Sequence, residues 1–173
     1  MLEKGLDINT PGCEKETPLD RTVHAIQNDL AAFLLERGAN PNGSSEIGWT
    51  VLHSAADYGN VVILKMLLAH GADVDPKTSG GSTPLDVAVR LGREGAMKAL
   101  IAAGADVNAV DNEGLTVLFN AVSRNRTAVV KALLEAGADA SSPAPDGGTL
   151  LKLATDQGYT EVAELLRRHG ATE

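Results

Sequence analysis

The sequence has 173 residues, of which 43% are hydrophobic but only 3% aromatic, and 15 basic against 23 acidic side chains give a net charge of −8. A chain of this length can bury a sizeable core, and the scarcity of aromatic residues makes that core aliphatic. The acidic balance argues against nucleic-acid or anionic-membrane binding, because phosphate recognition needs clustered lysine and arginine. The single cysteine, Cys13, excludes a disulfide framework and indicates a reducing compartment.

No segment of the sequence has the character of a targeting signal or a membrane span. The first five residues lack the apolar stretch of a signal peptide. The most apolar segment, residues 61–69, carries Lys65 and is too short to cross a bilayer. We therefore expect a soluble cytoplasmic protein.

The glycines follow a period of 33 residues, which is the first feature to look for in a chain with 18 of them. Six glycines keep this spacing, and from the second onward each is followed by alanine: Gly5, Gly38, Gly71, Gly104, Gly137 and Gly170. Five further matches in register arise by chance with a probability of about 10⁻⁵. The sequence therefore consists of internal repeats of 33 residues.

Other residue types keep the same period. A threonine recurs as Thr17, Thr50, Thr83, Thr116 and Thr149. Leucines stand two and seventeen residues after these threonines: Leu19, Leu52, Leu85, Leu118, Leu151, Leu34, Leu67, Leu100, Leu133 and Leu166. We expect these ten leucines to form the spine of the core. Five residues after the threonine is an alanine in four copies, and the exception, Thr22, indicates an end cap.

Each repeat begins with a short helix that the threonine caps at its N-terminus. Proline follows Thr17 and Thr83 at the first helical position, where its missing N–H costs nothing. Asp20 and Asp86 stand three residues after these threonines and are expected to complete capping boxes.

The first helix should end where a residue can adopt a left-handed backbone. Gly59, Gly92 and Gly158 suit this position, Asn125 can replace glycine there, and Ile26 fits it poorly. A second helix follows, for example over residues 61–68, and ends at the Gly-Ala pair. The polar stretches after it, such as residues 105–114, are too short for a helix and predict a protruding β-turn.

The second helix of the third repeat is the weakest of the series. Residues 94–100 include Gly95, which costs about 1 kcal/mol relative to alanine in a helix interior. The same helix has small residues where other copies have Val, Ile or Phe. We expect this helix to be the least stable part of the array.

Residues 50–55 read Thr-Val-Leu-His-Ser-Ala, and residues 83–88 read Thr-Pro-Leu-Asp-Val-Ala. With the period of 33, they resemble the Thr-Pro-Leu-His-x-Ala signature of the ankyrin repeat, and the resemblance covers essentially the whole chain. It implies an all-α solenoid of about five stacked helix-turn-helix repeats with β-turn fingers and a concave face. Stacking also follows from the residues, because one such unit cannot bury its own apolar face. In the fourth and fifth copies Phe119 and Lys152 replace the signature histidine. The hydrogen bonds that this histidine makes should therefore be confined to His53.

We expect a single domain over residues 1–173. Its predicted repeats are residues 12–44, 45–77, 78–110 and 111–143, followed by a C-terminal capping repeat at residues 144–173. In that last repeat Arg167 and other charged residues replace apolar ones. Residues 1–11 match the end of a preceding repeat. Either the chain is a fragment of a longer array, or this remnant and the polar first helix together form a cap.

The resemblance implies partner binding at the residues just before each threonine and at seven and eight residues after it. In the second repeat these are Glu46, Ile47, Trp49, Asp57 and Tyr58, which places the only tryptophan and one of two tyrosines on one patch. Both residue types are favoured anchors of interfaces. The alternative is that Trp49 packs across its own finger onto the neighbouring repeat. The same face continues through Arg90, Leu91, Asn112, Glu113, Leu115, Ser123, Arg124, Asp146, Asp156 and Gln157.

Catalysis finds little support in the sequence. The four histidines are spread along the array, and no metal-binding His pair, nucleophile elbow or phosphate-binding loop occurs. We expect a protein that is not an enzyme, with no cofactor and no metal, no nucleic-acid or membrane partner, and a monomeric state by itself. Its predicted function is to bind another protein as an inhibitor, an immunity-type protein or an adaptor. The alternative is a scaffolding or targeting segment of a longer multi-repeat protein.

Overall fold

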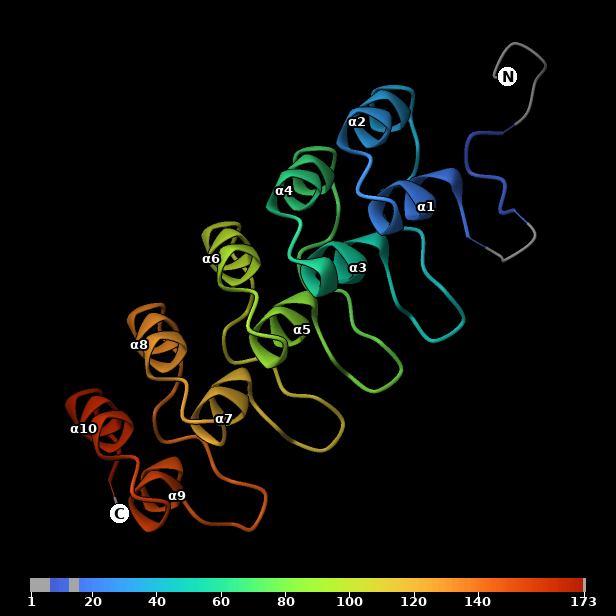
Figure 1. The fold of residues 1–173 in the computed structure, drawn as a ribbon. Coiled ribbons are helices and arrows are strands. Elements are labelled where there is room, and N and C mark those ends of the chain that lie inside the picture. Colours follow the sequence, from blue (N-terminus) through green and yellow to red (C-terminus); the bar gives the residue numbers. More distant parts are fainter. Residues whose placement is uncertain (1–6, 13–15, 173) are drawn as a thin grey trace.

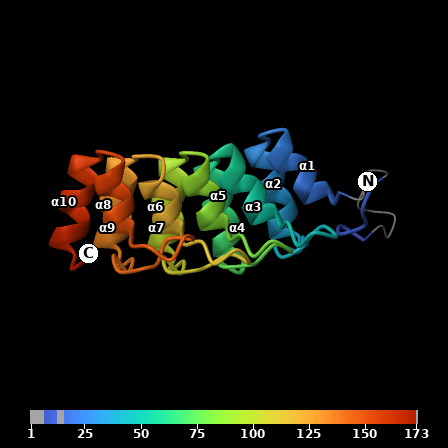
Figure 2. The same cartoon turned by 90° about the horizontal axis from the view of Figure 1, so that it is seen from below.

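The computed structural model describes residues 7–12 and 16–172, and these contain ten helices that stack in two rows (Figure 1). The first row consists of α1 (Pro18–His24), α3 (Val51–Tyr58), α5 (Pro84–Arg90), α7 (Val117–Val122) and α9 (Leu150–Asp156). The second row consists of α2 (Asn28–Glu36), α4 (Val61–Ala69), α6 (Glu94–Ala102), α8 (Thr127–Glu135) and α10 (Thr160–Arg168). Figure 2 shows that the connecting fingers run along one edge of the stack. The predicted all-α solenoid is confirmed.

All five threonines cap a first-row helix, as predicted. Each threonine side chain accepts a hydrogen bond from the backbone N–H three residues further on. Thr17 also forms the predicted capping box, because the Asp20 carboxylate accepts from the Thr17 N–H at 2.8 Å. His53 has the same role at α3, where its Nδ1 accepts from the Thr50 N–H at 3.1 Å.

The capping box predicted for Asp86 is wrong. The Thr83 hydroxyl accepts from the Asp86 N–H at 3.3 Å, but the Asp86 carboxylate turns toward the next repeat. There its Oδ1 accepts from the Asn120 amide at 2.9 Å, and its Oδ2 lies 3.6 Å from Arg90. The Asp86 carboxylate therefore bonds a donor 34 residues further along the chain and not the N-cap that its sequence spacing predicts.

The first-row helices end in left-handed backbone at the expected positions. Gly59, Gly92 and Gly158 have φ of 70°, 71° and 72°, and Asn125 takes φ of 53°. Ile26 also adopts this conformation, with φ of 54°. A β-branched side chain is strongly disfavoured there, so Ile26 is a point of backbone strain.

The predicted leucine spine is confirmed, because all ten leucines are at most 6% exposed. The alanines five residues after each threonine are also buried, which lets neighbouring first-row helices approach closely: Ala55, Ala88, Ala121 and Ala154. Thr22 takes this position in the first pair and is 1% exposed, with its hydroxyl donating to the Leu19 carbonyl at 2.7 Å. Thr22 is therefore a core residue of the first helix pair, and the end cap that this exception indicates stays a prediction.

The fingers are joined by a hydrogen bond that recurs at each junction. A side-chain oxygen accepts from the backbone N–H located 31 residues further along, and the acceptors are Asn9, Asn42, Asp75 and Asn108. Asn42 and Asn108 also donate their amide to the carbonyls of Gly71 and Gly137. These side-chain bonds make the fingers one continuous edge of the stack.

The N-terminal residues are described only in part. Gly5 and Cys13 lie outside the described residues, as do residues 1–6 of the expected remnant. Ile8 packs against the core, and Asn9 accepts from the Asn40 N–H at 2.7 Å. Residues 7–9 thus contact the first finger of the array in the same way as later fingers contact one another.

Helix α6 differs from its neighbours in two ways. It begins at Glu94, so Gly95 lies in its first turn and not in the helix interior that the sequence predicts. A Cβ atom at Gly95 would lie 3.0 Å from Val61, so glycine permits the close approach of α4 and α6. Among adjacent second-row helices, α6 and α8 also have the sparsest contact. The tertiary packing therefore supplies a second reason for low stability in α6.

We expect amide hydrogen exchange to be faster at residues 95–100 than at residues 61–68. Exchange reports local opening, which is easiest where few apolar contacts hold a helix. Hydrogen–deuterium exchange read by NMR measures this directly, with residues 128–133 of α8 as a further comparison. Slower exchange in α6 than in α4 would refute the prediction.

Candidate functional site

A groove of about 870 Å³ lies at the first end of the stack, between helix α1 and the finger that precedes α3. Its lining includes Ile47 and Trp49 from that finger and the polar residues Glu16, Asp20, His24 and Glu46. Trp49 is half-buried, because its Nε1 donates to the Ser54 hydroxyl at 2.9 Å and its ring lies 5.1 Å from the His53 ring. Trp49 therefore packs on the helix of its own repeat and also forms part of the groove wall.

Tyr58 extends this surface along the ends of α1 and α3. Its side chain is 46% exposed, and its ring lies 5.7 Å from the ring of His24. The Nδ1 atom of His24 is in turn 3.1 Å from the Glu16 carboxylate. The half-buried Asp57 lies next to Tyr58, and its backbone carbonyl accepts from Arg93 Nε at 2.7 Å. The structure thus joins the groove beside Trp49 to Tyr58 through His24.

Glu16 and His24 also line the groove, and sequence reasoning did not identify them. Glu16 stands just before Thr17 and His24 seven residues after it. These are the register positions that Trp49 and Asp57 occupy in the second repeat. Applying the positional rule to the first repeat as well would have found both residues.

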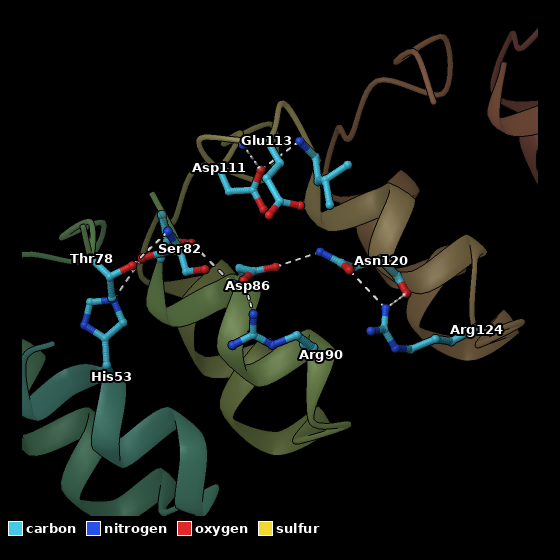
Figure 3. Close-up of polar contacts among 11 residues, drawn as sticks. His53, Thr78, Ser82, Asp86, Arg90, Asp111, Glu113, Asn120 and Arg124 are labelled. Carbon is cyan, nitrogen blue, oxygen red and sulfur yellow. Dashed lines mark hydrogen bonds and ion pairs between the residues drawn. The ribbon is translucent and has the colours of Figure 1, made fainter. Parts of the chain in front are cut away.

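The middle of the same face carries two arginines that polar contacts hold in place (Figure 3). Arg90 lies 3.6 Å from the Asp86 carboxylate, and Arg124 donates to the backbone and side-chain oxygens of Asn120 at 3.1 and 3.0 Å. Asn120 bonds Asp86, so the contacts form one chain across two repeats. Arg90 and Arg124 are both exposed, so their remaining N–H groups are accessible to a carboxylate.

His53 is a buried link between repeats. Its Nδ1 accepts from the Thr50 N–H, and its Nε2 lies 3.1 Å from the Ser82 carbonyl, an arrangement that fits the neutral ring with its proton on Nε2. Burial lowers the pKa of His53, while the Ser82 carbonyl and the Asp86 charge act in the opposite sense. The histidine of this register position forms its hydrogen bonds at His53, as the sequence predicts, and the Ser82 contact joins His53 to the next finger.

The remaining residues of the predicted surface differ in what they contact. The exposed ones are Leu91, Asn112, Glu113, Asp146, Asp156 and Gln157. Leu115 and Ser123 are half-buried, and the Ser123 hydroxyl donates to the Asn120 carbonyl at 3.3 Å. The amide of Asn112 donates to the Ser79 carbonyl at 2.8 Å, so this side chain helps to hold two finger tips together.

The described part of the chain lacks the features of a metal site or of a membrane span. No group of three or more His, Cys, Asp or Glu residues in it could hold a metal ion. The Asp111 carboxylate, in a segment with some likeness to a calcium loop, accepts from the N–H groups of Glu113 and Leu115 at 2.9 Å each. None of the helices described is long and apolar enough to cross a membrane.

Stacked helix pairs with capped first helices and hydrogen-bonded fingers define a helical repeat protein with an elongated exposed face. The family model described as ankyrin repeats (3 copies) matches residues 22–111 and 95–172. The chain therefore belongs to the ankyrin repeat family. Ankyrin repeats are generally protein–protein interaction modules and are typically not catalytic. A comparison with curated proteins found no match.

Proposed function

We propose that this chain binds a partner protein along its finger tips and first-row helices, with the groove beside Trp49 as the main contact. The observation that carries the proposal is the groove itself, where Trp49 and exposed Ile47 lie close to acidic side chains. Tyrosine and tryptophan are favoured anchors of binding energy, and Tyr58 continues the same surface. Glu16 and Asp20 in the groove favour a basic segment of the partner.

The proposed contact extends along the array beyond the groove. Arg90 and Arg124 suit acidic groups of the same partner, because both are exposed and positioned by the Asp86–Asn120 contact. The proposed contact residues are Glu46, Ile47, Trp49, Asp57, Tyr58, Arg90, Leu91, Asn112, Glu113, Leu115, Ser123, Arg124, Asp156 and Gln157. A cytoplasmic monomer with such a surface would act as an inhibitor, an immunity-type protein or an adaptor. The scaffolding alternative predicts that no single patch dominates binding.

The test compares an affinity pull-down by the wild-type protein with pull-downs by a double variant and by a control variant. The double variant combines Ile47→Ser with Tyr58→Ala. Ile47→Ser and Tyr58→Ala remove exposed side chains, which avoids the loss of fold that Trp49→Ala could cause through the Ser54 contact. We expect a partner that binds the wild type to lose affinity at least about tenfold in the double variant. Lys65→Ala on exposed α4 surface is the control and should bind normally. Unchanged affinity of a correctly folded double variant would refute the groove assignment.

A further inference from the structure

Helix α2 carries an exposed apolar stripe at the first end of the stack, away from the fingers. The stripe consists of Ile26, which precedes the helix, and of Leu30 and Phe33 in the helix; these side chains are 61%, 44% and 40% exposed. Spacings of three and four residues place Leu30, Phe33 and Arg37, which caps the C-terminus of α2, on one side of the helix. The Arg37 guanidinium lies 3.6 Å from the centroid of the Phe33 ring and covers part of it.

The register shows that this side of a second-row helix is normally covered. The residues at the position of Leu30 in the later helices are at most 4% exposed: Ile63, Ala96, Val129 and Val162. In α4 the covering helix is α2 itself, since these two helices pack against each other. The α2 stripe is therefore one half of the helix–helix contact that recurs along the stack, and its partner half is missing from the chain described.

Ile26 provides a second and independent observation. Four other copies place glycine or asparagine at this left-handed position, whereas Ile26 holds φ of 54° with its side chain mostly in solvent. The folded chain gains little apolar burial from this residue and bears its backbone strain. Strain of this kind is common at binding sites, and a contact made by the Ile26 side chain would account for it.

The neighbouring helix α1 limits what can cover the stripe. Arg21 is exposed on α1 at the register position where Ser54, Val87 and Asn120 are buried in the later helices. A complete helix pair stacked on this end would bury the Arg21 charge, which is costly without a partner. The stripe on α2 is therefore suited to a single helix, whereas the end of α1 is suited to solvent.

Charges exclude the other end of a second copy as the occupant. The apolar residues of α10 face inward. Its exposed surface carries four charged residues: Glu161, Glu164, Arg167 and Arg168. Asp29 and Glu36 are exposed seven residues apart on α2, which places them along one flank of the stripe. A helix that lies on the stripe would match this flank with lysine or arginine.

We propose that the α2 stripe is the docking site for a single amphipathic helix of a partner protein, with aliphatic anchors at helical spacing and basic residues along one flank. This site is separate from the groove beside Trp49, and it does not depend on the function proposed for that groove. It gives the chain a second contact surface at the end of the stack.

The test uses three synthetic helical peptides of about 16 residues. The first has leucines at i, i+3 and i+7 with flanking lysines, the second has flanking glutamates, and the third has the first composition in scrambled order. Fluorescence anisotropy should show the strongest binding for the lysine peptide, and NMR should place its contacts at residues 26–37. Leu30→Ser combined with Phe33→Ser should weaken binding at least about tenfold. Val62→Ser, on α4 at the register position of Asp29, is the matched control and should have no effect.

The Ile26→Gly variant distinguishes a role of Ile26 in docking from a role in stabilising the fold. We expect this variant to melt at a higher temperature than the wild type, because glycine adopts the left-handed backbone without strain, and to bind the lysine peptide at least about threefold more weakly. Ile47→Ser, which removes an exposed side chain of the groove, should leave peptide binding unchanged, and this distinguishes the stripe from the groove. Equal binding of the scrambled peptide, or contacts on the fingers, would overturn the proposal. A dimer of the free protein that Leu30→Ser dissociates would also overturn it, since the occupant would then be a second copy.

Discussion

Replacing Asp75 with asparagine should raise the free energy of unfolding by about 1 to 2 kcal/mol. Asp75 occupies the finger position that Asn42 and Asn108 occupy in other repeats, and its Oδ2 accepts from the Asp106 N–H at 3.0 Å. Its Oδ1 is buried and has no hydrogen-bond partner among the described residues, at the place where the two asparagines have an amide that donates to a glycine carbonyl. By register that glycine is Gly104, since Gly71 and Gly137 lie 33 residues to either side. An amide at position 75 would supply the missing donor.

The advantage of the Asp75→Asn variant should depend on pH. Burial raises the pKa of Asp75, the charges of Asp106 and Asp73 raise it further, and the Asp106 N–H and Lys77 act in the opposite sense. The native state then holds this proton more tightly than the unfolded chain. The wild type is therefore most stable, as far as this group is concerned, below the unfolded pKa of about 3.9, and loses stability as pH rises through the higher folded pKa.

Urea unfolding of both proteins at about pH 4 and about pH 7 measures this effect. The difference in the free energy of unfolding should be larger at neutral pH, because the raised pKa of Asp75 makes the wild type lose stability as the pH rises. The reverse substitution, Asn108→Asp, is the matched control and should destabilise the protein by a similar amount at neutral pH. A less stable Asp75→Asn variant, or an effect that does not change with pH, would contradict this account.

Replacing His53 with alanine should lower the free energy of unfolding by about 3 kcal/mol. The ring is fully buried, bonds Thr50 within its own repeat, and lies within hydrogen-bond distance of the Ser82 carbonyl of the next finger. Its loss would leave a cavity and an unpaired Thr50 N–H. His70→Ala is the control, because that side chain is exposed, and it should change stability by less than about 0.5 kcal/mol. Thermal and urea unfolding of the three proteins provide the measurement.

The His53 contribution should decrease on acidification. The folded pKa of His53 lies below its ordinary value of 6.5, so the unfolded chain takes up this proton first as the pH falls. Stability is therefore complete above about pH 6.5 and is lost as the pH falls toward the lower folded pKa. The difference in unfolding free energy between wild type and His53→Ala should shrink from about pH 7.5 to about pH 5. A difference that stays constant or grows would show that the neutral ring is not what stabilises the junction.

Much of the fold could be predicted because its signals are local and periodic. The threonine caps, the left-handed turns after the first helices and the buried leucines each depend on residues within one helix pair, and the period of 33 repeats them. Gly59 and Leu67, for example, have the roles that their register positions indicate. The patch around Trp49 could be placed for the same reason, because position in the register places a side chain on a known side of the unit.

Contacts between repeats could not be predicted in the same way. Asp86 has the spacing of a capping residue, but the donor that takes its carboxylate is Asn120 in the next repeat. Asp75 has a carboxylate where the equivalent residues of other repeats have an amide. Only the geometry of the finger junction shows that one of its oxygens has no hydrogen-bond partner in the described part of the chain. Tyr58 joins the groove through His24, a contact between two repeats that a one-repeat motif does not contain.

The sequence by itself determined that this chain is an array of stacked helix pairs with an aliphatic core and an exposed face of variable chemistry. Only the tertiary structure decided which polar side chains face a donor and which face solvent, and that no helix of the described residues covers one side of α2. The physical reason is the distance along the sequence over which each interaction acts. Helix caps and apolar periodicity act within about ten residues, whereas each junction pairs side chains some 30 residues apart, whose fit depends on the two repeats that meet there.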